Sequence, residues 1–423
     1  MDSSTVVIIV DGDGVSKSHK KKSDGFPCQP FVSIFSAKLS NNVHDMRKVI
    51  HSIKVGVALV LVSLLYLVDP FYKRVGENAM WAIMTVVLIF EFFTGGMLSK
   101  GLNRGIGTVL GGGLGCLGAA FAQAVGGVSK GIVVGIFVFV FSAGTTYTRQ
   151  MPNIKKYDYG AMIFIVTFNM IVVSGLHTDQ VMELARNRLS TVVIGFAICI
   201  FVSLLVFPIW ASDELHNTLA SRFELLALSL EGFSKEYFEN ANQKEKKTSS
   251  SFSSNCKSIL HSKTKDESLV NFARWEPWHR KYGFSYPWGK YLKLGEDLRE
   301  LAIIIISLKT CLRSSTQSFG ASRESIKESC EKVVASFAWT LRELGESIKK
   351  MRKCQFEELI VPKLKSIRVE LSFIVNPFAV EISLEKCDGL GLASFLYSLM
   401  EIVEKMEELA KEVEELGGFH ENR

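Results

Sequence analysis

Hydrophobic and polar positions divide the chain into two halves with different patterns. Between positions 49 and 210 charged residues are sparse and long apolar runs dominate, whereas beyond Ser212 charged side chains recur throughout. A helix rises about 1.5 Å per residue, so roughly 20 mainly apolar residues cross the hydrocarbon core of a bilayer. The first half therefore predicts a membrane domain with six spans, at 49–68, 78–98, 105–125, 130–148, 159–176 and 189–209.

The second half changes to the pattern of amphipathic helices in water. Apolar residues recur there at steps of three and four, which is typical of helices that bury one face in a bundle. The apolar run 298–312 is too short and too closely flanked by charge to span a membrane, so we expect a buried core helix. By contrast, 240–267 is polar, rich in Ser and Lys and without a period, which predicts a disordered loop. Three such stripes are Leu215, Leu219, Phe223, Leu226 and Leu230; Val333, Phe337, Leu341, Leu344 and Ile348; and Leu399, Ile402, Met406, Leu409 and Val413.

These patterns predict an all-α protein with a six-helix transmembrane domain followed by a cytosolic helical bundle domain. The expected parts are a flexible cytosolic arm (1–46), the transmembrane domain (47–211) and the helical domain (212–423). The arm does not resemble a cleavable signal peptide, because its apolar run 6–10 is five residues long and continues into Asp11 and Asp13.

Basic residues near the span ends predict the orientation in the membrane. The side that faces the N-terminal arm holds the stronger basic cluster, whereas basic residues on the other side are mixed with acids. Both termini are therefore placed in the cytosol, and an even number of spans agrees with this because it puts both termini on one side. The stronger cluster is Arg47, Lys48, Lys100, Arg104, Arg149, Lys155 and Lys156.

Composition and residue spacing argue against several functional classes. A net charge of +6 over 423 residues is small and does not form a basic domain with interleaved aromatics, so we expect no nucleic acid partner. The eight cysteines lack CxxC or Cys/His spacing, which predicts neither a metal site nor a disulfide framework. We find no nucleophile elbow or paired catalytic carboxylates, and His279 is better explained as a packed loop residue. We therefore expect no enzyme, no catalytic residues and no cofactor.

The third predicted span carries two GxxxG steps in tandem, through Gly107, Gly111 and Gly115. Such spacing lets another helix backbone approach closely, so tight helix packing is the favoured interpretation. A glycine-lined permeation path is the alternative.

Ionisable residues inside predicted spans are costly and indicate function. Glu91 lies inside the second span, Lys54 one turn inside the first, and Arg104 just before the third; Arg188 opens the sixth. We expect Glu91 to pair with Lys54 or Arg104. Snorkelling to the headgroups is the alternative for both cations. Basic residues at both mouths of a bundle favour anion selection, since rings of Lys and Arg select anions.

The segment Trp275-Glu-Pro-Trp-His279 resembles the WEPWH signature of the plant aluminium-activated malate transporter family. Further resemblance covers Lys54-Val-Gly, Asn78-Ala-Met-Trp81, Lys100-Gly-Leu-Asn-Arg104, Tyr157-Asp-Tyr-Gly and Arg188-Leu-Ser-Thr. The matching segments extend from about residue 47 to 310.

This resemblance implies a homodimer with six membrane helices per subunit that passively conducts malate and other anions through a lipid bilayer. It implies that Lys54, Arg104 and Arg188 line the anion pathway. Among the other residues of the spans, we expect Glu91, Lys100 and Trp81 to support the pore or the gate. The plasma membrane is the expected location, with the vacuolar membrane as the alternative.

Aluminium sensing in this family is expected to need acidic outer loops. Asp179 and Glu183 form one possible acidic pair here, but the loop near position 70 carries Lys73 and Arg74, which oppose a trivalent cation. The sequence therefore argues against activation by aluminium. Two further alternatives to a channel stay open, namely a coupled transporter or exporter of organic acids and a membrane-anchored scaffold that conducts nothing.

Overall fold

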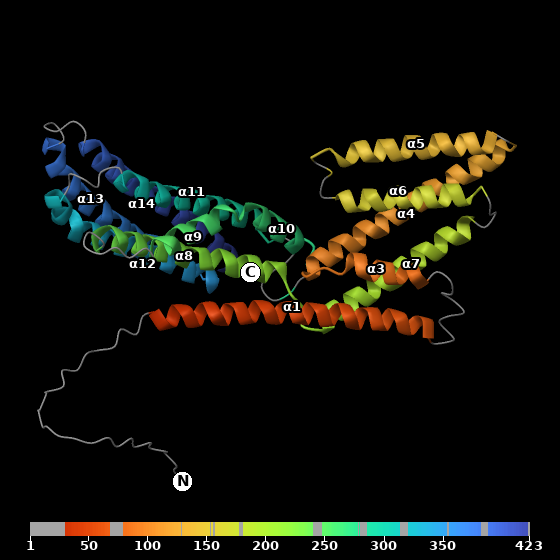
Figure 1. Ribbon diagram of the computed structural model, residues 1–423, viewed down its shortest axis with the longest axis horizontal. Coiled ribbons are helices and arrows are strands. Elements are labelled where there is room, and N and C mark those ends of the chain that lie inside the picture. The colour runs from red at the N-terminus through yellow and green to blue at the C-terminus, as the bar shows by residue number, and fades with distance from the viewer. Residues whose placement is uncertain are drawn as a thin grey trace, which may run out of the picture. The chain divides into compact units, whose positions relative to one another are not determined.

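The computed structural model describes residues 30–67, 79–127, 129–152, 154, 157–176, 181–239, 248–277, 279, 286–313, 320–352, 355–381 and 388–421. Its elements with defined bounds are all helices (Figure 1). The chain divides into two compact units, residues 1–53 and 54–423, of which the second holds most of the helices. The helices of the first half are α1 (Pro30–Leu67), α3 (Ala79–Ile89), α4 (Thr94–Val125), α5 (Ser129–Arg149), α6 (Asp158–Ser174) and α7 (Val181–Leu205).

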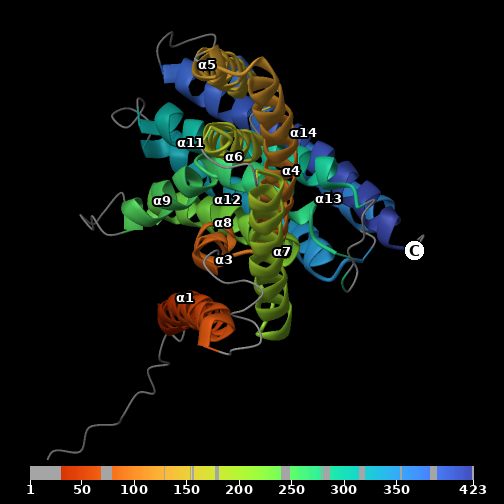
Figure 2. The ribbon, with the colours of Figure 1, turned by 90° about the vertical axis from the view of Figure 1, so that its right-hand side faces the viewer.

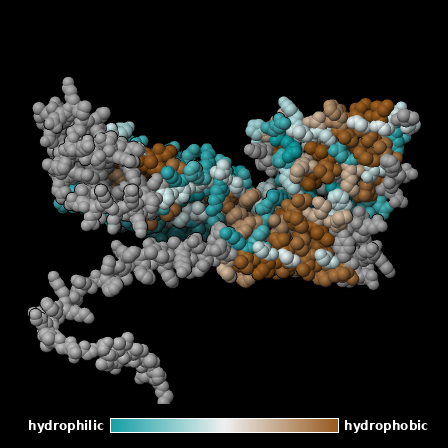
Figure 3. Space-filling view, in the orientation of Figure 1, coloured by the Kyte–Doolittle hydropathy of each residue, from teal (hydrophilic) through white to brown (hydrophobic). Residues whose placement is uncertain are grey.

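By length and composition α4, α5 and α7 can cross a membrane, and α3 and α6 are shorter apolar helices. These helices turn large apolar side chains outward: Leu117 on α4, Phe139 on α5 and Phe201 on α7 are each at least 60% exposed. The exposed surface of this part of the molecule is largely hydrophobic (Figure 3). Lipid solvates such a surface and water does not, because burial of apolar area is strongly favourable. The first half is therefore built for a membrane.

The second predicted span has the wrong boundary. Helix α3 ends at Ile89 and α4 begins at Thr94, so Leu98 belongs to the next helix. Phe93 adopts extended backbone angles, and the Thr94 amide donates to the Ile209 carbonyl at 3.1 Å. Because a tertiary hydrogen bond directs this break, hydropathy alone does not reveal it. The 11 residues of α3 rise about 16 Å, roughly half of the hydrocarbon core.

Close contact between α4 and α6 follows from the glycine spacing and confirms the interpretation as tight packing. A Cβ placed on Gly111 would lie 2.8 Å from the Phe164 carbonyl oxygen, and one on Gly115 would lie 3.0 Å from Ile171. Gly107 faces the Gly160 carbonyl in the same way. Figure 2 shows α6 lying against α4. The stripe therefore brings two backbones together, as small residues do in membrane helix pairs.

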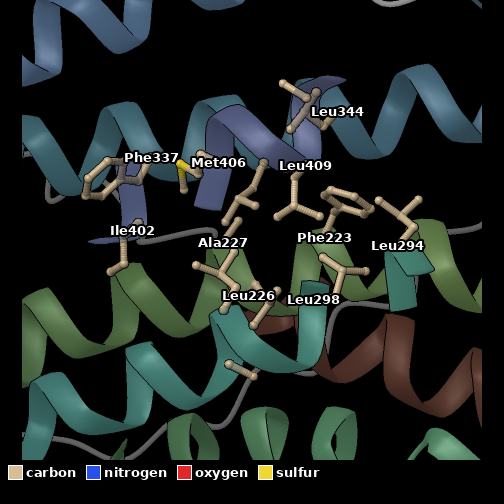
Figure 4. Packing of buried hydrophobic residues seen from close by; sticks show 14 of the residues in the cluster. Phe223, Leu226, Ala227, Leu294, Leu298, Phe337, Leu344, Ile402, Met406 and Leu409 are labelled. Carbon is tan, nitrogen blue, oxygen red and sulfur yellow. The ribbon is translucent and has the colours of Figure 1, made fainter. Parts of the chain in front are cut away.

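The second half forms a helical bundle with one hydrophobic core, as the amphipathic stripes predicted. Phe223, Leu226, Leu298, Phe337 and Met406 are all fully buried and meet in this core (Figure 4). Helices α8 and α12 pack along each other, as do α11 and α14. The elements are α8 (Ala211–Glu239), α9 (Thr248–Leu260), α10 (Lys263–Ala273), α11 (Trp288–Arg313), α12 (Gly320–Lys349), η3 (Phe356–Ile360), α13 (Val361–Glu381) and α14 (Asp388–Glu421).

The prediction of a disordered loop at 240–267 is wrong from Thr248 onward, where α9 and the start of α10 lie. Few residues anchor these helices: Cys256 and Ile259 enter the core from α9. Asp266 of α10 is buried and accepts hydrogen bonds from Arg222 of α8 at 2.8 and 2.5 Å and from Arg299 of α11 at 3.1 Å. Because residues 248–267 contribute few apolar side chains to the core and are held partly by a buried ion pair, their sequence shows no hydrophobic periodicity. Residues 240–247 lie outside the described residues.

The segment from Phe207 to Ser212 comprises the connection that follows α7 and the first two residues of α8. Phe207 has a φ of +47°, an unusual angle for a bulky residue and one that sits directly before Pro208. At the start of α8, the Glu276 carboxylate accepts hydrogen bonds from the amides of Ala211 at 2.5 Å and Ser212 at 3.2 Å, and from the Ser212 hydroxyl at 2.6 Å. Negative charge at a helix N-terminus is stabilising. Burial raises the pKa of the Glu276 carboxyl, while these hydrogen bonds act in the opposite direction.

Candidate anion-binding site

Arg104 lies about one-third of the way along α4 and is only 3% exposed. One terminal nitrogen of its guanidinium donates to the Tyr159 hydroxyl of α6 at 3.1 Å. Among the described residues its Nε has no hydrogen-bond partner, and neither has the Thr108 hydroxyl one turn further along α4. Buried polar groups are normally satisfied, so two unsatisfied groups on one helix face indicate a place that takes a ligand or water.

Arg188 lies on α7 and is 4% exposed. Its Nε donates to the Thr167 hydroxyl at 3.4 Å and a terminal nitrogen donates to the Met170 sulfur at 3.0 Å, both on α6. The guanidinium carbon lies 4.1 Å from the centre of the Trp81 ring on α3. Stacking on an indole face fixes the plane of the guanidinium and favours its charge.

Helix packing places both arginines against α6, where Arg104 contacts Tyr159 and Arg188 contacts Thr167 and Met170. Among the described residues no carboxylate lies within ion-pair distance of either arginine. Buried charges are normally paired, because an unpaired charge loses its hydration without compensation. Two unpaired guanidinium groups beside three hydroxyl groups form a site whose chemistry is complementary to an anion.

Lys54 is also buried, at 2% exposure, but its ammonium donates to the Phe207 carbonyl at 2.7 Å. The expected pairing of Glu91 with Lys54 or Arg104 is wrong. Glu91 forms an ion pair with Lys100 instead, and both side chains are about one-third exposed. Glu91 lies in the break between α3 and α4, and its carboxylate pairs with a lysine in the second turn of α4. Among the described residues Lys54 therefore has no carboxylate partner, and its ammonium is held by a backbone carbonyl.

The other residues predicted for the site are Trp81 and the acidic pair of the outer loop, Asp179 and Glu183. Trp81 stacks against the Arg188 guanidinium. Glu183 is exposed and lies 3.9 Å from Arg186 on its own helix, so that this acid is offset by a neighbouring base. Asp179 lies outside the described residues, so the acidic pair stays a prediction. Among the described residues no group of three His, Cys, Asp or Glu side chains could hold a metal ion.

Sequence reasoning did not single out the hydroxyl groups that surround the two arginines. Tyr159, Thr167 and Thr108 have no motif of their own. A usable signal existed for Thr167, which with Asn169 interrupts an otherwise apolar run of α6, and for Tyr159, which stands in the matching segment Tyr157-Asp-Tyr-Gly. His279 is a packed loop residue: its ring stacks on Trp210 with centroids 3.8 Å apart.

The chain matches the sequence profile of the family described as "Aluminium activated malate transporter" over residues 41–376. It belongs to this family. Aluminum-activated malate transporter 2 of Arabidopsis thaliana is 38% identical over 376 residues, a match that covers 88% of this chain and 75% of the relative. Aluminum-activated malate transporter 12 of the same plant is 40% identical over 316 residues, covering 74% of this chain and 56% of the relative.

Membership of the aluminium-activated malate transporter family makes this chain a membrane protein, in accord with its apolar helices. The related proteins are named as transporters and not as enzymes. Aluminum-activated malate transporter 1 of Triticum aestivum, 35% identical over 323 residues and matched over 73% of this chain and 69% of its own length, extends the likeness to a second plant. The chain spans less than two-thirds of several of these relatives, 56% and 59% in two cases.

Proposed function

We propose that this member of the aluminium-activated malate transporter family is a passive anion channel for malate and related organic or inorganic anions across a plant membrane. Arg104 and Arg188 carry the proposal, since both guanidinium groups are buried without a carboxylate partner in the described residues. Together with Lys54 they form the proposed anion pathway. The relatives are named for malate transport, and malate is an anion of the kind that such a site would bind.

Arg104 and Arg188 suit a carboxylate for a geometrical reason. A guanidinium presents parallel N–H donors that match the two oxygens of a carboxylate. Arg188 uses two donors on weak or long contacts, and the Nε of Arg104 has no partner in the part of the chain that the structure describes. An anion that enters loses water but gains charge-assisted hydrogen bonds, each worth about 1.5–3 kcal/mol. These weak contacts within the protein are readily exchanged for contacts to an anion.

The proposed architecture is a membrane domain of six apolar segments, α1, α3, α4, α5, α6 and α7, followed by a cytosolic helical domain. Both termini lie in the cytosol, because basic residues gather on that side of the spans. The protein is proposed to act as a homodimer in the plasma membrane. The hydrophobic face of α5, with Phe139 73% exposed, is available to lipid or to a second subunit.

Electrical recording of the purified protein in a planar lipid bilayer tests the proposal. The reversal potential should follow the gradients of malate, nitrate and chloride as these anions are exchanged. A reversal potential that ignores the anion gradients contradicts the channel. Saturation at low substrate with strict coupling to a second ion indicates a coupled transporter, and absence of any transport indicates a scaffold.

Arginine substitutions test the pathway. We expect Arg104→Gln and Arg188→Gln each to weaken apparent malate affinity about ten- to hundredfold, since each removes a charge-assisted contact. Arg186→Gln is the matched control, because this arginine lies on the same helix as Arg188 but is 77% exposed. Arg186→Gln should keep the wild-type dependence of current on malate. If Arg104→Gln and Arg188→Gln also keep it, the pathway lies elsewhere.

A further inference from the structure

The segment Phe207–Ser212 is held by parts of the chain that are far apart in sequence. Lys54 donates to the Phe207 carbonyl at 2.7 Å, from α1. Thr94, the first residue of α4, donates its amide to the Ile209 carbonyl at 3.1 Å and its hydroxyl to the same oxygen at 3.3 Å. His279 stacks on Trp210.

Glu276 of the Trp275–His279 signature completes this set at the first turn of α8. One carboxylate oxygen accepts from the Ala211 amide, and the other accepts from the amide and the hydroxyl of Ser212. Glu276 is 5% exposed and replaces the side-chain cap that a helix start usually needs. The signature loop therefore binds the end of the membrane domain to the beginning of the helical domain.

The first turn of α4 depends on the same segment. Its preceding residue, Phe93, supplies no side-chain cap, so the Thr94 amide relies on the Ile209 carbonyl. Gly95 and Gly96 let Phe272, the residue before the end of α10, approach α4 without a Cβ in the way. Ten residues beyond Thr94 along the same continuous helix lies Arg104, about 15 Å away at the usual helical rise.

The backbone of the segment is strained at Phe207, where φ is positive. Its positive φ is strained for a residue with a Cβ, and strained backbone persists where the surroundings impose it. Such positions cluster at switches, where a small change of contacts can release them. Here Lys54 contacts the carbonyl of the strained residue itself.

We propose that Phe207–Ser212 is a coupling joint, in which Glu276 and Thr94 are positioning residues that transmit rearrangements of the helical domain to α4 and the Arg104 region. The inference rests on the proposed function for its effect on current, but the contacts themselves do not. A shift of α8 moves Ile209, because only Trp210 separates Ile209 from Ala211, the first residue of α8. The Ile209 carbonyl moves Thr94, and α4 carries the displacement along its axis as a rigid helix.

Hydrogen–deuterium exchange of the full-length protein in lipid nanodiscs tests the coupling without any current. Glu276→Gln keeps one acceptor oxygen and replaces the other with an NH2 group, which cannot accept the hydrogen bond that Ala211 or Ser212 donates there. We expect amides of residues 211–214 to exchange roughly tenfold faster, and the amides of 94–97 to accelerate with them. Glu415→Gln is the control, because it removes the same charge from a side chain that is 61% exposed. Acceleration confined to 211–214 makes Glu276 a local cap and overturns the joint.

Channel recording supplies the second measurement. Glu276→Gln and Thr94→Val should shift the voltage at which half of the channels open, while the permeability ratios of malate, nitrate and chloride stay as in wild type. If the half-opening voltage is unchanged in both variants, or if the permeability ratios change, Glu276 and Thr94 are not positioning residues. If Glu276→Gln fails to accumulate, Thr94→Val alone decides by the same two measurements. If the wild type carries no anion current, the proposed function fails, and the exchange result still decides the joint.

Discussion

Gly111 on α4 offers a test of the helix contact on which the arginine site depends. Alanine at this position would place a Cβ 2.8 Å from the Phe164 carbonyl oxygen, about 0.6 Å inside the 3.4 Å at which ordinary contact begins. The neighbour is backbone of α6, so no flexible side chain can move aside. Separating the helices shifts Thr167 and Tyr159 relative to Arg104, because the first two lie on α6 and the arginine lies on α4.

The magnitude of this effect follows from two opposing contributions. Overpacking of a tight contact costs about 1–3 kcal/mol. A helix gains about 0.5–1 kcal/mol when Ala replaces Gly, because less backbone entropy is lost. We therefore expect Gly111→Ala to destabilise the protein by about 1–2 kcal/mol. Gly113→Ala, two residues along the same helix, meets no atom of the described residues within 4 Å and should be neutral or slightly stabilising.

Thermal unfolding of both variants in the same nanodiscs measures the difference, and malate current measures its consequence at the site. Opposite signs for the two glycines are the decisive result. Equal destabilisation of Gly111→Ala and Gly113→Ala would mean that general helix effects dominate and that α4 and α6 do not touch at Gly111.

Two further predictions concern the helical domain. Asp266→Asn leaves Arg222 and Arg299 without their buried carboxylate and should destabilise the domain by about 3–5 kcal/mol in chemical unfolding; exposed Glu328→Gln is the control, and equal effects would refute the buried network. The Arg342 guanidinium holds the pKa of Glu231 below its usual value, so this pair stabilises the fold above the ordinary carboxyl pKa and loses its effect as pH falls through the lowered one. The difference in unfolding free energy between wild type and Glu231→Gln is about 1 kcal/mol or less, because water screens this partly exposed pair. Thermal unfolding should therefore show the melting temperatures of the two proteins converging between about pH 6 and pH 3. A difference that grows with acidification would reverse the assignment.

Much of the fold was predictable because it depends on local pattern. Apolar length marked the membrane half, and steps of three and four marked the core positions Phe223, Phe337 and Met406. The glycine spacing predicted the close helix contact. The break before Thr94 and helices α9 and α10 were missed, because a hydrogen bond to Ile209 and an ion pair at Asp266 decide them.

For the candidate site, the sequence by itself determined which charges enter the apolar half, and family resemblance supported Lys54, Arg104 and Arg188 as one group. The sequence did not determine the contact partners of these charged side chains. Only the tertiary structure decided that Glu91 pairs with Lys100, that Lys54 contacts the Phe207 carbonyl and that Trp81 lies under Arg188. Charge and hydropathy belong to single residues and can be read along the chain. Pairing depends on distance between helices, which the packing of α4, α6 and α7 sets and no local pattern records.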